Sequence, residues 1–241
     1  MQISRKSWLR YVNKLRAVDA RAADLMLEYI TTHGTKNTQQ LIAYAYGLAT
    51  KYGEASAALT AQIYDSIAEL SGVHAPAADV ADTATYPEVA KTVNGTLKTG
   101  NPKIVSDAVG ALVKKTGADT MLKNAIRDRA QFAWIPNGDT CAFCLTLASR
   151  GWQDATPAAL KGGHAEHIHP HCDCQYCIRF NTDTTIEGYE PEKYLEQYED
   201  AEGTSSKDKI NALRRQHYAE NKDEINAQKR AAYAAKKERE Q

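Results

Sequence analysis

All five cysteines of this chain lie between Cys141 and Cys177, within a span of 37 residues that also contains four histidines. This span has few large aliphatic side chains, so burial of apolar surface would hold it together only weakly. Thiolate and imidazole groups are the ligands that Zn²⁺ prefers, and a structural zinc ion contributes folding free energy directly. The cluster therefore predicts a small Cys/His module, residues 134–182, that is stabilised by zinc.

The spacing of the cysteines divides the expected site into two halves. Cys141-Ala-Phe-Cys144 is a Cys-x-x-Cys pair, whose sulfurs bind one ion at about 2.3 Å and supply half of a tetrahedron. The other half must come from a second stretch with five candidate ligands: His169, His171, Cys172, Cys174 and Cys177. We expect Cys141, Cys144, His169 and either Cys172 or Cys174 to bind the metal, and Cys177 is the most expendable. Disulfides and free thiols are the alternatives, although a reducing cytoplasm disfavours disulfides and an odd number of cysteines leaves one over.

Residues 1–133 show the periodicity of successive amphipathic helices. Apolar side chains recur at spacings of three, four and seven along the first helix: Trp8, Tyr11, Val12, Leu15, Val18, Leu25, Met26 and Tyr29. Gly34, Gly53 and Gly117 are expected to end helices. The sequence therefore predicts a helical body, whose further helices lie at 37–52, 54–71, 87–98, 102–116 and 118–132. The periodicity lapses at residues 71–85, where we expect a loop.

The charges of the chain sum to zero but are unevenly distributed. Residues 183–203 carry eight acidic side chains against Lys193 alone, whereas residues 206–241 carry ten basic and six acidic ones. The later segment also has high helix propensity and few apolar residues. We expect an acidic linker at residues 183–205 and a charged helical tail at residues 206–241, both as solvated surface segments or as sites of electrostatic docking. The predicted fold class is thus mainly α, with a small α+β zinc module.

Composition excludes two classes of protein. With 43% hydrophobic and 25% charged residues, the chain is not wholly disordered. Its longest nearly apolar stretch, Leu41 to Ala49, is far shorter than the roughly 20 residues that span a bilayer. Arg5, Lys6 and Arg10 interrupt the start of the sequence, so a secretory signal is not expected. We therefore expect a protein that folds in a cytoplasm and does not bind membranes.

Two classes of enzyme use similar Cys and His residues, and the spacing in this chain differs from both. A zinc deaminase needs a strand and a helix between its His-x-Glu and its cysteine pair, and only seven residues separate Glu166 from Cys174. The sequence Glu166-His167-Ile168-His169-Pro170 between two Cys-x-x-Cys pairs resembles the core of HNH-type nucleases, with His167 as general base. His167 lies only seven residues before Cys174, closer than in that family. A zinc-supported, HNH-like nuclease acting on DNA is the alternative function, and a cytoplasmic zinc-containing adaptor is a third interpretation.

A longer pattern resembles a known family. Cys141-Ala-Phe-Cys144, Arg150-Gly-Trp152 and His169-Pro-His-Cys172-Asp-Cys174 are similar to the C-terminal signature of phage minor head proteins, the Mu F-like head morphogenesis family. The paired motif of that family falls on Cys141, Cys144, His169, Cys172 and Cys174. The chain departs from the family pattern at Asp173 and by the addition of His171 and Cys177.

The resemblance implies a structural component of the virion and not an enzyme. Proteins of this family associate with the portal or the inner face of the capsid and act in head assembly. It implies portal and major capsid proteins as partners, an oligomeric arrangement within the virion, a structural zinc ion and synthesis in the bacterial host cytoplasm. Packaged DNA is a further possible partner, through the basic tail.

Overall fold

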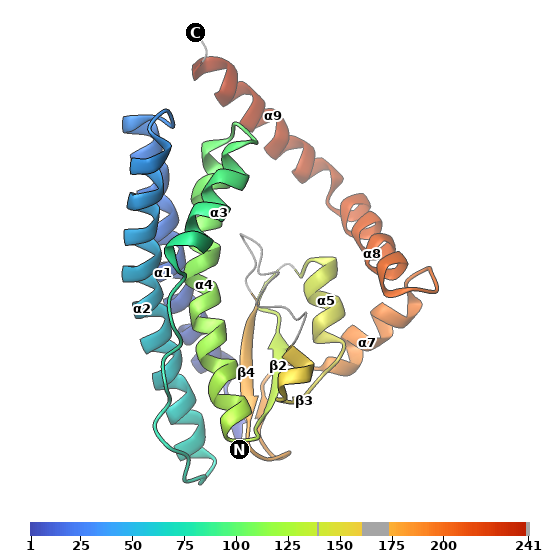
Figure 1. Cartoon of the computed structure of the whole chain (residues 1–241). Coiled ribbons are helices and arrows are strands. Elements are labelled where there is room, and N and C mark those ends of the chain that lie inside the picture. Colours follow the sequence, from blue (N-terminus) through green and yellow to red (C-terminus); the bar gives the residue numbers. More distant parts are fainter. Residues whose placement is uncertain (139, 161–173, 240–241) are drawn as a thin grey trace.

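The computed structural model of the chain describes residues 1–138, 140–160 and 174–239, and it is mainly helical, as predicted (Figure 1). The helices are α1 (Arg5–His33), α2 (Thr38–Leu70), α3 (Tyr86–Leu97), α4 (Pro102–Arg127), α5 (Ala142–Ala148), α6 (Pro157–Leu160), α7 (Pro191–Asp200), α8 (Ser206–Glu220) and α9 (Lys222–Arg239). The strands are β1 (Gln2–Ile3), β2 (Gln131–Ile135), β3 (Gln153–Asp154), β4 (Gln175–Arg179) and β5 (Thr185–Ile186). Within the described ranges, no helix has the length and apolar character needed to cross a membrane.

Three long helices, α1, α2 and α4, pack side by side, and α3 packs against α2 and α4 (Figure 1). The predicted stripe of α1 faces this interior, where Trp8, Val12 and Met26 are at most 1% exposed. The helix begins where the Oγ of Ser4 accepts a hydrogen bond from the Ser7 amide at 3.2 Å, and it ends at Gly34, which has a φ of 70°. The prediction of one long first helix is confirmed.

Two predicted helix ends are wrong, because Gly53 and Gly117 lie inside the continuous helices α2 and α4. A Cβ atom at residue 117 would lie 2.6 Å from the Oγ of Ser56 and 3.1 Å from the Oγ1 of Thr60, so α4 and α2 approach each other closely there. A Cβ atom at residue 53 would lie 3.0 Å from the Cγ2 of Thr83. Packing of the two long helices outweighs the roughly 1 kcal/mol that glycine costs in a helix interior.

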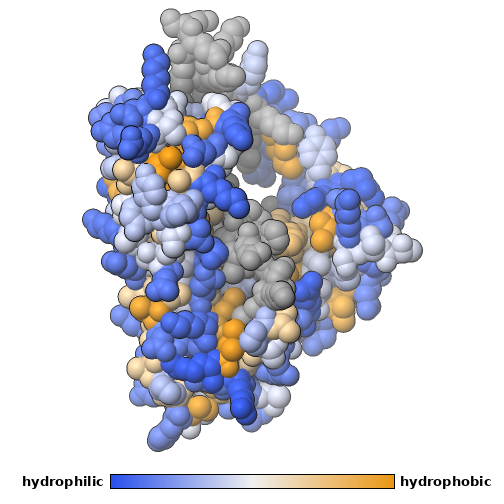
Figure 2. Space-filling model, viewed as in Figure 1, coloured by the Kyte–Doolittle hydropathy of each residue, from blue (hydrophilic) through white to orange (hydrophobic). Residues whose placement is uncertain are grey.

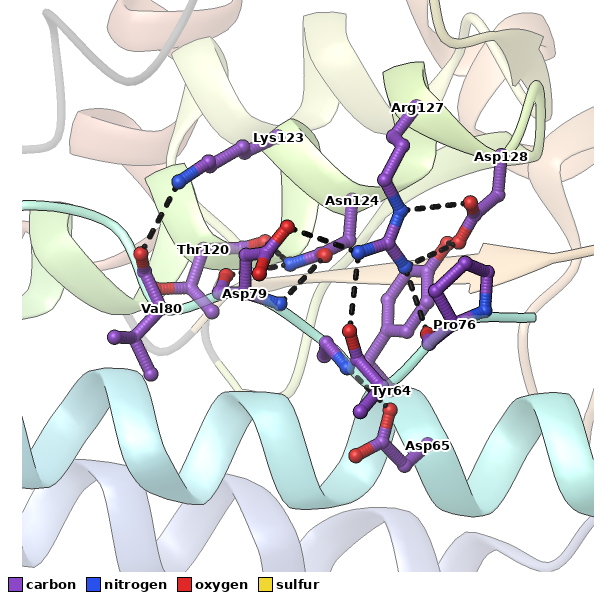
Figure 3. Close-up of polar contacts among 12 residues, drawn as sticks. Tyr64, Asp65, Pro76, Asp79, Val80, Thr120, Lys123, Asn124, Arg127 and Asp128 are labelled. Atoms are coloured by element: carbon purple, nitrogen blue, oxygen red, sulfur yellow. Dashed lines mark hydrogen bonds and ion pairs between the residues drawn. The ribbon is translucent and has the colours of Figure 1, made fainter.

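Residues 73–85 form an extended strap between α2 and α3, as the lapse in periodicity predicts (Figure 3). Side chains of the neighbouring helices form hydrogen bonds with its backbone, as a partner strand would in a sheet. Asn124 both accepts from the Asp79 amide at 2.9 Å and donates to the Asp79 carbonyl at 2.8 Å. The strap amides of Ala78 and Ala81 donate to Asp65 at 2.8 Å and to Thr120 at 3.0 Å. These bonds satisfy backbone groups that an isolated extended segment would leave to water.

Arg127 fixes the start of the strap from the end of α4 (Figure 3). Its guanidinium donates to the carbonyls of Pro76 at 2.8 Å and Ala77 at 3.0 Å, and it pairs with Asp79 at 3.1 Å and Asp128 at 2.8 Å. The hydrogen bond from Arg127 holds the pKa of Asp128 below its usual range. One side chain thus links three points of the strap to the helical body.

A three-stranded antiparallel sheet follows α4, in the order β3-β2-β4. The helix predicted at 118–132 is too long, because α4 ends at Arg127, Arg129 adopts a φ of 53° and β2 begins at Gln131. The predicted boundary between residues 133 and 134 falls inside β2. One core cluster combines residues of α1, α2 and α4 with residues of β2, β4 and α5. The helical body and the segment that contains the cysteines therefore share a core.

The acidic segment is more structured than its composition indicates, and the tail is helical, as predicted. Residues 183–205 contain β5, which pairs in parallel with β1, and helix α7. The tail forms α8 and α9, which extend away from the sheet (Figure 1). Leu213 of α8 is 6% exposed and packs with Ala142 and Leu145 of α5. The tail is thus attached to the molecule through α8.

The face of the molecule in Figure 2 is mostly hydrophilic, and its hydrophobic residues form separate small patches. Among the described residues, the exposed large apolar side chains are mostly widely spaced along the sequence: Tyr46, Leu70, Val80, Tyr86, Ile104, Leu195, Tyr218 and Tyr233. Of these, Tyr46 and Tyr86 contact each other, with ring centroids 5.5 Å apart. Hydrophobic residues scattered in this way are ordinary for a folded protein.

Candidate metal centre

The turn after β2 carries the chain towards the first cysteine pair and is held to the helical body. The indole Nε1 of Trp8 donates a hydrogen bond to the Oδ1 of Asn137 at 2.6 Å, and the Nδ2 of Asn137 donates to the carbonyl of Ile135 at 2.9 Å. A guanidinium nitrogen of Arg5 donates to the carbonyl of Pro136 at 3.4 Å. These two contacts from α1 fix Pro136 and Asn137, which lie five and four residues before Cys141.

The Cys-x-x-Cys pair occupies the start of α5. Cys141 is the N-cap residue, with extended φ and ψ of −62° and 155°, and Cys144 lies in the first helical turn. Side chains at the N-cap and at the third helical position lie on the same side of a helix start, which is why they pair in a capping box. Cys141 is half-buried, whereas Cys144 is completely buried. This arrangement suits two sulfurs that face one ion.

The second stretch of the cluster enters the described structure at Cys174, directly before β4. In the β2–β4 ladder, Ile135 lies opposite Gln175 and Ala133 lies opposite Cys177. Because side chains alternate along a strand, Cys174 and Cys177 lie on opposite faces of the sheet. Cys174 is 3% exposed, and Cys177 is fully buried. An extended backbone from Cys174 into β4 does not favour a second Cys-x-x-Cys clamp.

Cys177 has the surroundings of a protonated core thiol. Its Sγ donates to the carbonyl of Ile178 at 3.6 Å, and burial raises the pKa of Cys177 to about 12. A metal ligand has to be a thiolate, which this apolar position disfavours. The expectation that Cys177 is the most expendable of the cysteines agrees with this environment.

Three of the predicted ligands belong to or border one core cluster of the structure. Cys144 and Cys174 belong to the same core cluster, and Cys141 packs against it. Of the five predicted ligands, His169 and Cys172 lie outside the described residues, as do His167 and His171. In the ranges that are described, no group of three or more His, Cys, Asp or Glu side chains is placed to hold an ion. Cys141, Cys144 and Cys174 therefore do not form a three-ligand site by themselves. The predicted site needs ligands from residues 161–173.

Aromatic side chains line the sheet beside these cysteines. Tyr176 packs edge-on against Trp134, with ring centroids 4.5 Å apart, and burial raises the pKa of the Tyr176 hydroxyl. Trp134 and Trp152 are both packing residues: Trp134 is 2% exposed, and Trp152 packs partly buried against the same core.

A further contact was not predicted from the sequence. The guanidinium of Arg179 lies 4.7 Å from the ring centroid of Trp152, while its Nε donates to the Oε1 of Gln131 at 2.8 Å. The register between β2 and β4 places Arg179 opposite Gln131, and the sequence carries no local signal for that pairing.

A comparison with protein families matches residues 2–201 to the family described as VG15 protein. The chain belongs to the VG15 family. This is a family of viral (phage) proteins, so the phage origin implied by the sequence resemblance is supported, whereas the match does not extend to the Mu F-like minor head type. The match includes the whole cysteine cluster and ends one residue after α7, so α8 and α9 of this VG15 family member lie outside it. No match was found among the curated proteins or among the solved structures.

Proposed function

We propose that this phage protein is a minor capsid component that acts in head morphogenesis, at the portal or on the inner face of the shell. The observation that carries the proposal is the ordered pair of motifs, Cys141-Ala-Phe-Cys144 and His169-Pro-His-Cys172-Asp-Cys174, in a chain of a phage family. The body of long packed helices is consistent with a role in assembly, since its length gives neighbouring proteins extended faces to contact. Portal and major capsid proteins are the proposed partners, and the role is structural rather than enzymatic.

Zinc is part of the proposal. Cys141 and Cys144 at the start of α5 would hold one side of the ion, and His169 with Cys172 or Cys174 would hold the other. Such an ion, when bound, supplies folding free energy by closing the connection between α5 and β4. The chemistry of the described donors fits this role in part, since two of the sulfurs share a helix start and Cys174 belongs to the core cluster against which that helix packs.

Mass spectrometry of purified phage particles tests the proposed location. We expect the chain to be present at low copy number beside the portal protein, and a pull-down with the portal protein should recover it from infected cells. Particles that lack the chain, together with a portal pull-down that does not contain it, would refute the structural role.

A nuclease assay separates the proposal from the alternative function. Glu166, His167 and His169, which would form the nuclease core, lie outside the described residues. The purified protein should leave plasmid DNA intact in the presence of Mg²⁺ or Mn²⁺. Metal-dependent cleavage that His167→Ala abolishes would replace the structural role by the HNH-like one.

A further inference from the structure

The first half of α1 presents a basic face to solvent. Lys6, Arg10, Lys14 and Arg21 are all exposed. At 3.6 residues per turn, these four positions fall within an arc of roughly 80° around the helix axis. Seen along α1, the four side chains therefore form one stripe, which we call the basic face (Lys6, Arg10, Lys14 and Arg21).

Lys6, Arg10 and Lys14 have no acidic neighbour on their side of α1, and Asp24 lies on the same side about one turn beyond Arg21. Asp19 is the only acidic residue of α1 before Asp24. Its Oδ1 atom is buried, and its carboxylate interacts with Lys114 of α4, so it belongs to the interior side of α1. Within the described structure, the side chains of the basic face make no hydrogen bond or ion pair. They are available to an anionic partner.

The dimensions of the basic face suit a row of phosphates. With a rise of 1.5 Å per residue, Lys6 to Arg21 extend over roughly 22 Å along one rigid helix. A single DNA strand carries one phosphate per about 3.4 Å of axis, so the basic face spans several successive phosphates. A shallow, open hollow lies on this surface, lined by Lys6, Leu9, Arg10, Asn13 and Lys14.

The composition of this face favours nucleic acid over a protein partner. A protein interface needs an apolar centre, and Leu9, which is half-buried, is the only large apolar residue that lines the hollow. In the tail, by contrast, acidic side chains interrupt the basic ones: Asp208 lies between Lys207 and Lys209, and Arg215 lies 3.9 Å from Glu202. The basic side chains of α8 therefore stand among acidic ones, whereas most of those of the basic face do not.

We propose that the basic face of α1 binds the phosphate backbone of duplex DNA without sequence specificity. Lys6, Arg10, Lys14 and Arg21 would contact successive phosphates, and the amide of Asn13 would donate to the same backbone. This inference goes beyond the proposed capsid role and does not depend on it, because DNA binding and incorporation into particles are measured separately.

Fluorescence anisotropy with a short labelled duplex of mixed sequence tests the proposal on the full-length chain. The test variant is Lys6→Gln/Arg10→Gln/Lys14→Gln, and the matched variant of the tail is Lys207→Gln/Arg214→Gln/Arg215→Gln, whose three side chains are also exposed. Removal of three phosphate contacts should weaken binding about tenfold or more and reduce the slope of log K against log [salt] by about 3. The tail variant should keep most of the DNA affinity of the unmodified protein. Its slope of log K against log [salt] should also stay close to that of the unmodified protein.

A second control separates a local effect from a change in net charge. Lys36→Gln/Lys91→Gln/Lys98→Gln removes the same charge from exposed positions outside the basic face and should bind DNA like the unmodified chain. Circular dichroism verifies that each variant is folded. An α1 variant that binds DNA as well as the unmodified chain overturns the proposal, and so does an equal loss in either control. Sedimentation velocity tests a second copy of the chain as the partner. If the unmodified chain self-associates, and the α1 variant does not but keeps its DNA affinity, the basic face binds a second copy and the proposal is wrong.

Discussion

The indole of Trp8 and the side-chain amide of Asn137 are joined by a hydrogen bond of 2.6 Å, although 129 residues separate them in the sequence. The bond connects the first turn of α1 to the turn between β2 and the first cysteine pair. Trp8 is itself 1% exposed, so its N–H group has no access to water that would replace a missing acceptor. The position of the cysteine pair thus depends on the N-terminal helix.

Asn137→Ala should lower the free energy of unfolding by about 1–3 kcal/mol, because it leaves the buried Trp8 N–H without its acceptor. Urea unfolding monitored by tryptophan fluorescence measures the change. Asn94→Ala, at an exposed position of α3, is the control and should change stability by less than about 0.5 kcal/mol. Equal stability of the two variants would show that the bond contributes nothing.

Gly117→Ala should destabilise the protein by about 1–3 kcal/mol, because its Cβ would lie 2.6 Å from the Oγ of the buried Ser56. Gly95→Ala in α3 is the matched change, since no atom lies within 4 Å of its Cβ. It should stabilise the protein by about 0.5–1 kcal/mol. Thermal unfolding compares the two variants, and the same sign of shift for both would contradict the close packing of α2 and α4.

Arg127→Ala should release the strap of residues 73–85, because it removes hydrogen bonds to two carbonyl groups and the ion pair with Asp79. The loss should cost about 1–3 kcal/mol locally. Hydrogen exchange should then accelerate at the amides of Ala78 and Ala81 by about tenfold or more. Lys123→Ala is the control, since it removes a single bond of 3.3 Å to the Val80 carbonyl, and it should leave those amides protected. Unchanged exchange in Arg127→Ala would disprove the anchoring role.

Asp19 predicts a specific pH dependence of stability. Burial raises its pKa from the usual 3.8 to about 7, whereas the positive charge of Lys114 acts in the opposite direction. Because the folded state holds the proton more tightly than the unfolded state, the contribution of Asp19 to stability is fully present below pH 4 and is lost as the pH rises through 7. Asp19→Asn should therefore be more stable than the unmodified protein at pH 8, with a difference that disappears towards pH 4. Urea unfolding across this range measures it, and a difference independent of pH would exclude a titrating Asp19.

Metal content should distinguish the cysteines. We expect Cys141→Ala to lose bound zinc and Cys177→Ala to retain it, because the thiol of Cys177 is buried, protonated and bonded to the Ile178 carbonyl. Mass spectrometry of metals in purified, folded protein gives the zinc content per chain. If both variants contain as much zinc as the unmodified protein, or if the unmodified protein contains none, the proposed ligand set is wrong.

The helices were largely predictable from the sequence, and their ends were less so. The apolar spacing from Trp8 to Tyr29 reports on burial, which is the main determinant of an amphipathic helix. Gly53 and Gly117 misled the prediction because glycine either ends a helix or permits close packing within it, and only the position of Ser56 and Thr83 on neighbouring elements decides between the two.

The candidate site was predictable in its first half. Cys-x-x-Cys spacing brings Cys141 and Cys144 to one side of a helix start without help from the rest of the chain. The role of Cys177 depends on which face of β4 it occupies, and that is set by its pairing with Ala133, whereas Cys174 lies directly before the strand. The bond between Trp8 and Asn137 is likewise a product of tertiary structure, for which a single sequence carries no local signal.

The parallel pairing of β1 with β5 has a consequence for biosynthesis. Gln2 and Ile3 pair with Thr185 and Ile186, and the amide of Arg5 donates to Glu187 at 2.9 Å. A ribosome makes β1 first, yet β1 has no partner until residue 186 has left the exit tunnel. Contacts between such distant parts of a chain close slowly, so β1 is secured only after the sheet, α5 and β5 have all been synthesised.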